Sequence, residues 1–255
     1  MNPIKVAIDG PSGVGKSSTS QKLSEMLGFE RLDSGKIYRS ITYALLLKMN
    51  KFKKQPEKLN KTITEEYIRE NEMFIRNFSV DNPVGTFNMH YSEYNKSVDK
   101  YVKRKMEISC DELKQYFVEK NVSIVAKIDI VRTRVSKLQH EIINSAKNGI
   151  IVDGRDIGTV IMPDAHVKIF LTASPDVRAK RRFDEILQEQ KTTDINYEKV
   201  LEDIKTRDYN DINRKIGPLL KAKDAIEIDC SYMTFNEQVQ KIYDAVVEQK
   251  NSMKA

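Results

Sequence analysis

Eight residues near the N-terminus have the spacing of a loop that binds polyphosphate. They read Gly10-Pro-Ser-Gly-Val-Gly-Lys-Ser17 and follow an apolar run at 4–9, which predicts a buried strand. A strand, a glycine-rich turn and a helix in this order direct backbone N–H groups at a phosphate near the positive end of the helix. The alternative is a glycine-rich turn that carries Lys-Ser by chance. Because all eight positions are in register behind a strand, we favour phosphate binding.

The loop also supplies a charge and a metal ligand for a nucleoside triphosphate. Lys16 is placed to reach the β- and γ-phosphate oxygens, and the Ser17 hydroxyl is placed to bind Mg²⁺. A second Mg²⁺ ligand is predicted at Asp153, which ends an apolar strand as a Walker B carboxylate does. The alternative for Asp153 is an aspartate in a turn or at a helix N-cap. The residues assigned to the ATP phosphates are Gly10, Ser12, Gly13, Gly15, Lys16, Ser17 and Ser18.

Arginines form two groups in the C-terminal half of the chain. Arg178 and Arg182 lie one helical turn apart and share a face. A second polar stripe, with spacing i, i+3, i+4 and i+7, consists of Arg207, Asn210, Asp211 and Arg214. Such a stripe is often only a solvated face. Beside a phosphate loop it favours phosphoryl transfer, because arginine stays charged and its planar fork matches phosphate oxygens. The predicted catalytic cations are Lys16, Arg178, Arg182 and Arg207.

The composition predicts a soluble protein with an excess of positive charge. The chain has 255 residues, is 40% hydrophobic and 31% charged, and has a formal net charge of +6 with a pI near 9.0. No apolar run approaches the ~20 residues of a membrane span, and strand and loop begin at once, so we expect no membrane partner and a cytoplasmic location. Cys110 and Cys230 are too few and too distant for a disulfide framework. The basic residues lack interleaved aromatics, so we expect phosphorylated substrates and no nucleic acid.

The elements that must position these groups alternate between strand and helix. The chain is predicted to form five strands, at 4–9, 29–32, 150–152, 167–171 and 225–229. Helical periodicity predicts helices at 16–27, 34–49, 128–142, 175–187 and 194–209, and a last helix after the capping box Thr234-x-x-Glu237. This order predicts an α/β protein, a three-layer P-loop fold with a five-stranded parallel sheet.

A polar stretch interrupts this alternation. From 51 to 122 lysine, glutamate and asparagine dominate, and the apolar residues lose a clear period. We interpret 51–122 as a small inserted domain, with strands at 73–80 and 86–91 and a helix at 111–119. Such an insertion is often a lid or a binding domain, and the alternative is a variable surface excursion. The predicted core then comprises 1–50 and 123–255, with a helical lid near 178–214.

Five ordered motifs resemble those of the bacterial-type cytidylate kinases. They are Asp9-Gly-Pro-Ser-Gly-Val-Gly-Lys16, Leu32-Asp-Ser-Gly-Lys-Ile-Tyr-Arg39, Asp153-Gly-Arg-Asp-Ile-Gly-Thr159, Met162-Pro-Asp-Ala165 and Ile204-Lys-Thr-Arg-Asp208. The resemblance covers 3–49 and about 123–247. It implies transfer of the γ-phosphoryl group of ATP to CMP or dCMP, with Mg²⁺, and a monophosphate-binding role for the insertion.

The resemblance also implies individual roles. Arg155 matches a phosphate-binding arginine, and Asp156 matches a carboxylate that accepts from the cytosine amino group, the donor that separates cytosine from uracil. Arg132 matches a base-reading arginine, although Arg134 competes with it if the helix is shifted by two residues. One position departs from the family pattern, because Asn210 stands where an arginine is usual. The implied CMP-binding residues are Ser34, Arg39, Ser123, Arg132, Arg155, Asp156, Arg207, Asp211 and Arg214.

Two other functions compete with this interpretation. A nucleotide-gated RNA-binding or ribosome-associated P-loop protein would account for the high pI, but the chain has no guanine-specifying motif and no aromatic RNA-binding stretch. Another small-molecule kinase on the same core is disfavoured by the 153–156 motif. We expect a monomer that takes ATP and CMP or dCMP as small-molecule substrates.

Overall fold

The computed structural model describes residues 3–50, 61–81, 87–95, 97, 99–190 and 196–253. Contacts divide the chain into a first unit, 1–31 with 146–255, and a second unit, 32–145. The second unit therefore extends beyond the predicted insertion, because helices on both sides of that insertion pack within it. Parts of the predicted insertion and lid, at 51–60, 82–86 and 191–195, lie outside the described residues.

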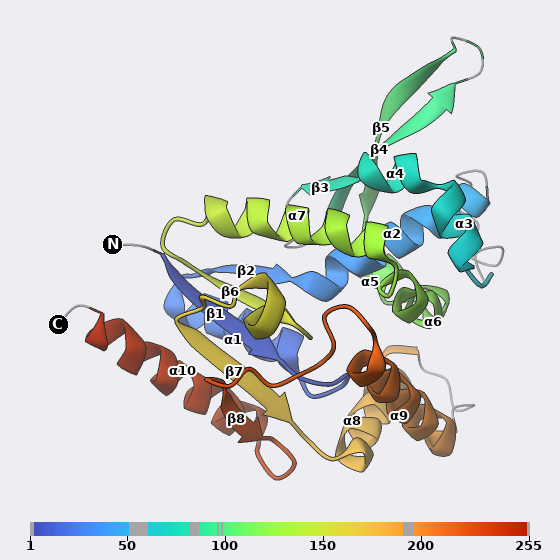
Figure 1. Cartoon of the computed structure of the whole chain (residues 1–255). Coiled ribbons are helices and arrows are strands. Elements are labelled where there is room, and N and C mark those ends of the chain that lie inside the picture. Colours follow the sequence, from blue (N-terminus) through green and yellow to red (C-terminus); the bar gives the residue numbers. More distant parts are fainter. Residues whose placement is uncertain are drawn as a thin grey trace. The chain divides into compact units, whose positions relative to one another are not determined.

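A five-stranded sheet organises the part of the chain that carries the glycine-rich loop, which confirms the predicted fold class. Its strand order is β2-β6-β1-β7-β8, and the pairings of β1 with β6 and β7, and of β7 with β8, are parallel (Figure 1). The central strand β1 leads directly into the glycine-rich loop. The strands are β1 (Ile4–Asp9), β2 (Glu30–Asp33), β6 (Gly149–Gly154), β7 (Val167–Thr172) and β8 (Ile226–Asp229).

Helices α1 (Lys16–Leu27) and α10 (Phe235–Ser252) pack beside each other on this sheet (Figure 1). As predicted, α1 ends at Gly28, whose φ of 65° is left-handed, and α10 begins with a complete Thr234–Glu237 capping box. The buried Gln238 side chain donates to Thr19 Oγ1 at 2.6 Å and links the two helices. The apolar core beneath them includes Val6, Ile8, Leu23, Ile169, Leu171 and Ile242.

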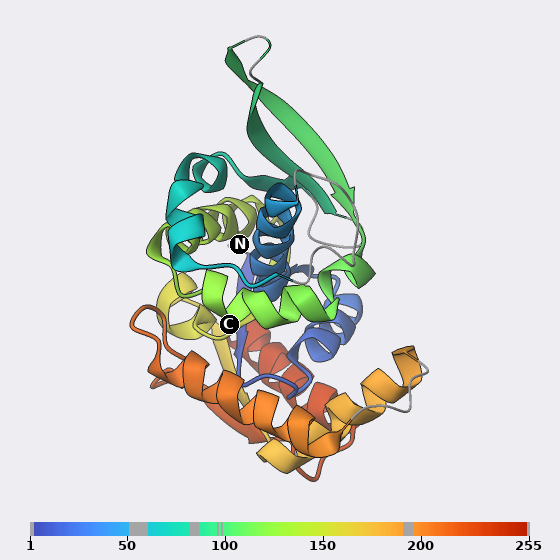
Figure 2. The ribbon, with the colours of Figure 1, turned by 90° about the vertical axis from the view of Figure 1, so that its right-hand side faces the viewer.

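A helical pair forms the remaining part of the first unit. Helices α8 (Pro175–Gln190) and α9 (Tyr197–Asn213) lie side by side (Figure 2), and the rings of Phe183 and Tyr197 meet edge to face at 5.9 Å. Helix α9 runs four residues beyond its predicted end at 209. After β6 the chain forms a π-helical turn, η2 (Ile157–Ile161).

The second unit combines helices with a three-stranded antiparallel sheet in the order β3-β4-β5. The β4–β5 hairpin projects beyond the helices of this unit (Figures 1 and 2). The elements are α2 (Ser34–Met49), α3 (Glu65–Glu70), α4 (Glu72–Arg76), β3 (Ser79–Asp81), β4 (Phe87–Asn95), β5 (Lys100–Ile108), α5 (Cys110–Leu113), α6 (Tyr116–Val125) and α7 (Asp129–Ser145).

Two predictions for the insertion were wrong in detail. The predicted strand 73–80 begins as helix α4, because Phe74, Ile75 and Phe78 are buried together at helical spacing and not at alternate positions. The predicted helix 111–119 is two helices, since Ser109 and Glu112 form a capping box that starts α5 separately from α6. The predicted strand 86–91 is confirmed from Phe87 and continues to Asn95.

Among the described residues, no helix is both long and apolar enough to cross a membrane.

Candidate active site

The glycines of the phosphate loop stand where other residues would not fit. Gly10 has a φ of 153°, and a Cβ there would lie 2.3 Å from the carbonyl oxygen of Leu171 on β7. Gly13 and Gly15 have φ values of 74° and 92°. Gly15 is also the N-cap of α1, so the first N–H groups of that helix face the loop. The backbone therefore has the local shape that a bound phosphate requires.

Lys16 is more enclosed than a loop lysine is expected to be. Its exposed fraction is 7%, and its Nζ donates to the carbonyl oxygen of Pro11 at 2.6 Å. Burial lowers the pKa of Lys16 well below its usual value, and the nearby charge of Arg155 lowers it further. An anion bound in the loop would raise the pKa of this lysine again.

Asp153 lies within β6 and faces α1. One carboxylate oxygen, Oδ2, accepts from the Ser17 hydroxyl at 3.1 Å. The other, Oδ1, accepts from the Ser20 hydroxyl at 2.5 Å and lies 3.3 Å from Nη2 of Arg31. Asp153 is therefore neither a turn residue nor a helix cap, which removes the structural alternative considered for it. Its Oδ2 and the Ser17 hydroxyl are adjacent oxygen atoms that could both bind a metal ion.

Arg31, which was not predicted as a site residue, holds this carboxylate. The Arg31 Nε donates to Ser20 Oγ at 2.7 Å, and its Nη1 donates to Gln21 Oε1 at 3.1 Å. Because Arg31 lies in β2 and is buried, its charge needs a buried partner, and Asp153 supplies one. The signal that was available is an arginine inside a short predicted strand, at 29–32.

Asp9 is a second buried carboxylate, and it has no role in the predicted site. Its two oxygens accept from the backbone N–H groups of Ile157 and Gly158 at 2.9 and 2.7 Å, and so hold the start of η2 against β1. Burial raises the pKa of Asp9 to about 6, and the nearby Asp156 adds to this shift. The two N–H donors act in the opposite direction but do not compensate for burial.

Four predicted substrate-binding residues form one network of ion pairs. Arg155 Nε donates to Asp211 Oδ2 at 2.8 Å. Arg214 lies 3.8 Å from the other oxygen of Asp211 and 3.3 Å from Asp156 Oδ1. Burial alone would raise the pKa of Asp211, but the charges of Arg155 and Arg207 hold it below its usual value. The structure thus brings the end of β6 together with the end of α9.

Arg214 reaches this network from outside the helix. Helix α9 ends at Asn213, and Arg214 is its C-cap residue with extended backbone angles. Its Nε donates to the carbonyl oxygen of Gly217. The predicted helical stripe therefore holds for 207–211 but not for its last member, which the chain turn after α9 places.

Arg178 is buried and connects three segments of the first unit by polar contacts. It donates from Nε to the Ala173 carbonyl oxygen at 2.9 Å and from Nη1 to the Ser12 carbonyl oxygen at 3.0 Å. Its Nη2 lies 2.7 Å from Asp208 on α9. Arg182, one turn further along α8, instead pairs with Glu185 at 2.7 Å near the surface. Arg178 and Arg182 thus have different environments although their spacing is helical.

Residues predicted for CMP also occur in the second unit. Ser34 begins α2 and accepts from Gln139 Nε2 on α7 at 2.7 Å. Arg39 has two long ion pairs, 3.5 Å to Asp33 and 3.7 Å to Glu119. Its Nε is buried and has no hydrogen-bond partner among the described residues. A buried donor of this kind is typical of a residue that binds a ligand.

Arg132 and Arg134 lie in different surroundings on α7. Arg132 is buried and its Nη1 approaches the Ala126 carbonyl oxygen at 3.4 Å. Arg134 instead donates from Nε to the Phe78 carbonyl oxygen at 2.5 Å and lines a separate pocket. The two residues therefore have distinct roles in the fold, and the choice of Arg132 as base reader stays a prediction. Ser123 lies on α6.

The donors beside the loop suit magnesium. Mg²⁺ prefers oxygen ligands and usually takes one or two from the protein, with the rest from phosphates and water. Ser17 and Asp153 offer such a pair, 3.1 Å apart. No cluster of three or more His, Cys, Asp or Glu residues that could hold a metal occurs in the described part of the chain.

Known proteins of one family match this chain over nearly its whole length. The sequence model of the cytidylate kinase family matches residues 6–248. A cytidylate kinase of Onion yellows phytoplasma is 38% identical over 251 residues, covering 98% of both chains. A cytidylate kinase of Clostridium tetani is 36% identical over 239 residues, covering 94% of this chain and 92% of its own. One of Fusobacterium nucleatum is 37% identical, covering 94% and 95%.

Proposed function

This chain belongs to the cytidylate kinase family, and from that premise we propose that it transfers the γ-phosphoryl group of ATP to CMP or dCMP, giving ADP and CDP or dCDP. Membership of this family makes the chain an ATP-dependent nucleoside monophosphate kinase. The observation that carries the choice of substrate is the network of Arg155, Asp211, Arg214 and Asp156, which combines phosphate-binding cations with an acceptor for an amino group.

The phosphate loop is proposed to bind ATP. The N–H groups of the loop and of the start of α1 surround the β-phosphate, and Lys16 neutralises the β- and γ-oxygens. Mg²⁺, held by Ser17 and Asp153, would neutralise charge on the same oxygens. Arg31 keeps Asp153 Oδ1 occupied, so Oδ2 remains directed at Ser17. The proposed phosphate ligands are Gly10, Ser12, Gly13, Gly15, Lys16, Ser17 and Ser18.

The first-unit network is proposed to bind CMP by exchange of partners. Arg155 and Arg214 now pair with carboxylates, and a phosphate dianion offers them more charge and a bidentate geometry. Asp156, released from Arg214, can then accept from the cytosine N4 amino group. Asp211 can accept from the ribose hydroxyls. Arg207 is proposed to bind phosphate as well, because its charge already lowers the pKa of Lys16 and of Asp211.

In the second unit, Ser34, Arg39, Ser123 and Arg132 are proposed CMP ligands. Arg39 is the best supported, because its ion pairs are long and its Nε lacks a partner among the described residues. Arg132 is favoured over Arg134 as base reader, because Arg134 is held by Phe78 on another part of the α7 surface.

The proposed roles of larger segments follow the same assignment. We place monophosphate binding in 51–122 and a lid at 178–214, on a core of 1–50 and 123–255. The lid assignment is supported by the packing of helices α8 and α9 on each other. Ala179, Val200 and Ile204 form a separate small apolar cluster in this pair. Lys16, Arg178, Arg182 and Arg207 are the proposed catalytic cations, with Arg178 acting on the loop backbone through Ser12.

A panel of nucleoside monophosphates tests the proposed function. With ATP and Mg²⁺, kcat/KM for CMP and dCMP should exceed that for UMP and AMP by about tenfold or more, since a buried carboxylate opposite an acceptor is left unpaired. The variant Asp156→Asn should narrow the gap between CMP and UMP. Asp164→Asn, a change at a surface ion pair, is the control and should leave the ratio unchanged. Equal kcat/KM for CMP and UMP in the unmodified protein would contradict the role of Asp156.

A further inference from the structure

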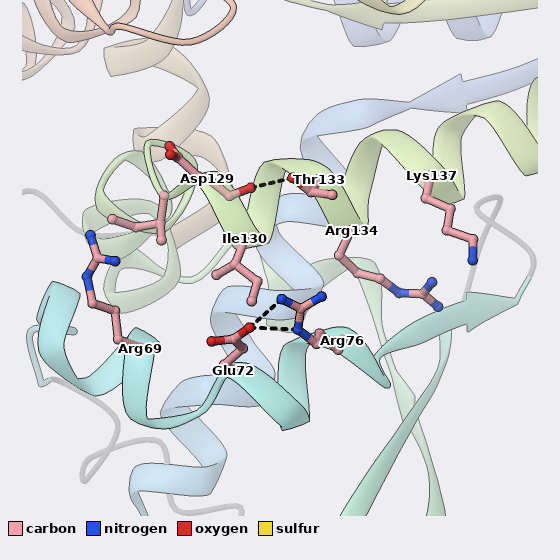
Figure 3. A pocket seen from close by; sticks show the side chains of 9 residues that line it. Arg69, Glu72, Arg76, Asp129, Ile130, Thr133, Arg134 and Lys137 are labelled. Atoms are coloured by element: carbon pink, nitrogen blue, oxygen red, sulfur yellow. Dashed lines mark hydrogen bonds and ion pairs between the residues drawn. The ribbon is translucent and has the colours of Figure 1, made fainter.

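A pocket of about 460 Å³ lies within the second unit, between the α3–α4 segment and the first half of α7 (Figure 3). None of the individual residues proposed above for ATP or CMP lines it, although its α3–α4 wall lies within the segment 51–122 to which monophosphate binding is assigned. The α3–α4 wall carries Arg69, Glu72 and Arg76, and the α7 wall carries Asp129, Arg134 and Lys137. Its volume is within the range of sites for small molecules.

The walls of this pocket are held by packing and by one polar contact. Ile68 and Ile75 on one wall, and Val131 and Val135 on the other, are fully buried. The Nε of Arg134 donates to the Phe78 carbonyl oxygen, just after α4, and so ties α7 to the opposite wall. The guanidinium of Arg134 is thus positioned before any ligand arrives, which lowers the entropy cost of binding.

The pocket has an excess of positive charge. Four cations and two carboxylates line it, which leaves a net charge of +2. Glu72 pairs with Arg76 on its own wall. Within the described part of the chain, the side chains of Arg69 and Lys137 make no hydrogen bond or ion pair. Three cations are therefore left around one cavity with a single remaining carboxylate, that of Asp129.

We propose that this pocket binds a small molecule through a dianionic phosphate or pyrophosphate group, with Arg69, Arg134 and Lys137 as its ligands. Guanidinium forks match phosphate oxygens in geometry, and lysine adds a point charge. Cations gathered around a cavity repel one another, so an anion between them relieves repulsion as well as forming new bonds. The volume admits either free pyrophosphate or the phosphate end of a nucleotide.

Calorimetric titration with inorganic pyrophosphate tests this site. The titration is made on the Lys16→Ala protein, so that binding at the phosphate loop is weakened. In that background the pair Arg69→Gln and Lys137→Gln removes two pocket cations. The matched control, Lys103→Gln and Lys105→Gln, removes two exposed cations from β5 of the same unit. All four side chains are exposed, so folding should be unaffected, and a thermal midpoint for each variant checks this.

Saturable binding of pyrophosphate should weaken by at least about tenfold in the pocket pair and by less than about twofold in the control pair. Hydrogen exchange should show protection at 65–76 and 129–137 on binding. An absence of saturable binding, or equal weakening in both pairs, would overturn the proposal, because the latter indicates only diffuse surface attraction. A parallel titration with ADP separates the two sources of the phosphate. If ADP and pyrophosphate bind with equal affinity, the natural ligand is free pyrophosphate. If ADP binds more tightly than pyrophosphate through the same cations, the natural ligand is a nucleotide.

Discussion

One ion pair from each unit shows how burial changes the cost of losing a charged partner. In the first unit Arg31 and Asp153 are 7% and 3% exposed and share hydrogen bonds with Ser20. In the second unit Arg76 and Glu72 form a pair that is 58% and 46% exposed. A buried charge that loses its partner is costly, whereas an exposed one is solvated by water. The Arg31–Asp153 pair therefore tolerates little change, whereas the exposed cation of Arg76 can exchange its partner for a ligand.

The largest difference should appear when each arginine is removed. Arg31→Met should lower the free energy of unfolding by about 3–5 kcal/mol, because it leaves Asp153 charged and buried. Arg76→Met should change it by less than about 1 kcal/mol. Urea unfolding of the two variants measures both effects. Similar losses would show that burial does not distinguish these pairs.

The Arg31 variants also test whether this residue positions Asp153. If it does, Arg31→Met should weaken the binding of Mn²⁺ with ADP, measured by electron paramagnetic resonance of the free ion, and Arg31→Lys should restore part of it. A purely structural role predicts lower stability with unchanged Mn²⁺ affinity in the fraction that is folded.

Lys16→Ala should affect catalysis far more than stability. We expect kcat to fall by about two orders of magnitude or more, since a preorganised charge at the transferred group is lost. The thermal midpoint should stay the same or rise, because the buried Lys16 has a lowered pKa and so destabilises the fold when it is charged. Lys22→Ala, at an exposed position on the same helix, is the control. A kcat near that of the unmodified protein would remove the loop from catalysis.

Asp9 should make the first unit sensitive to pH. The folded protein holds the Asp9 proton more tightly than the unfolded chain, because the pKa is raised to about 6. The free energy of unfolding should therefore fall by on the order of 3 kcal/mol as pH rises from about 4 to about 6, and then level off. Urea unfolding over this range measures the slope.

Two variants test whether Asp9 causes this pH dependence of stability. Asp9→Asn should be less stable, because its amide group faces a backbone N–H, and it should lose the slope. Asp164→Asn removes a carboxyl whose pKa is lowered by Lys5, so its contribution is lost as pH falls and is small. An unchanged slope in Asp9→Asn would assign the pH dependence to other groups.

The smallest expected effect concerns position 210 on α9. A side chain there shares a helix face with Arg207 and Asp211, so an arginine would add a charge to the proposed catalytic group. Asn210→Arg should raise kcat for CMP by about tenfold with little change in either KM, because the charge acts mainly in the transition state. Steady-state kinetics on the purified variant would decide this. A flat or lower kcat would show that another residue already serves there.

Local rules were sufficient for much of the fold. The phosphate loop, the left-handed Gly28 and the Thr234–Glu237 capping box each depend on residues a few positions apart, so a short stretch of chain determines them. Strands β1, β6 and β7 were recognisable because parallel strands buried on both faces form largely apolar runs. These features can be recognised without knowing which distant segment each one contacts.

Contacts between distant segments decided the rest. Asp9 finds its N–H donors 148 and 149 residues away, and Arg31 finds Asp153 after 122, so no spacing rule reveals either pair. The helix at 72–76 replaced a predicted strand because burial of Phe74 and Ile75 depends on what packs against them. The pocket beside Arg134 likewise needs two walls from separate helices. Which charges are buried and paired is a property of tertiary packing, because the cost of burial depends on the surroundings and not on the residue alone.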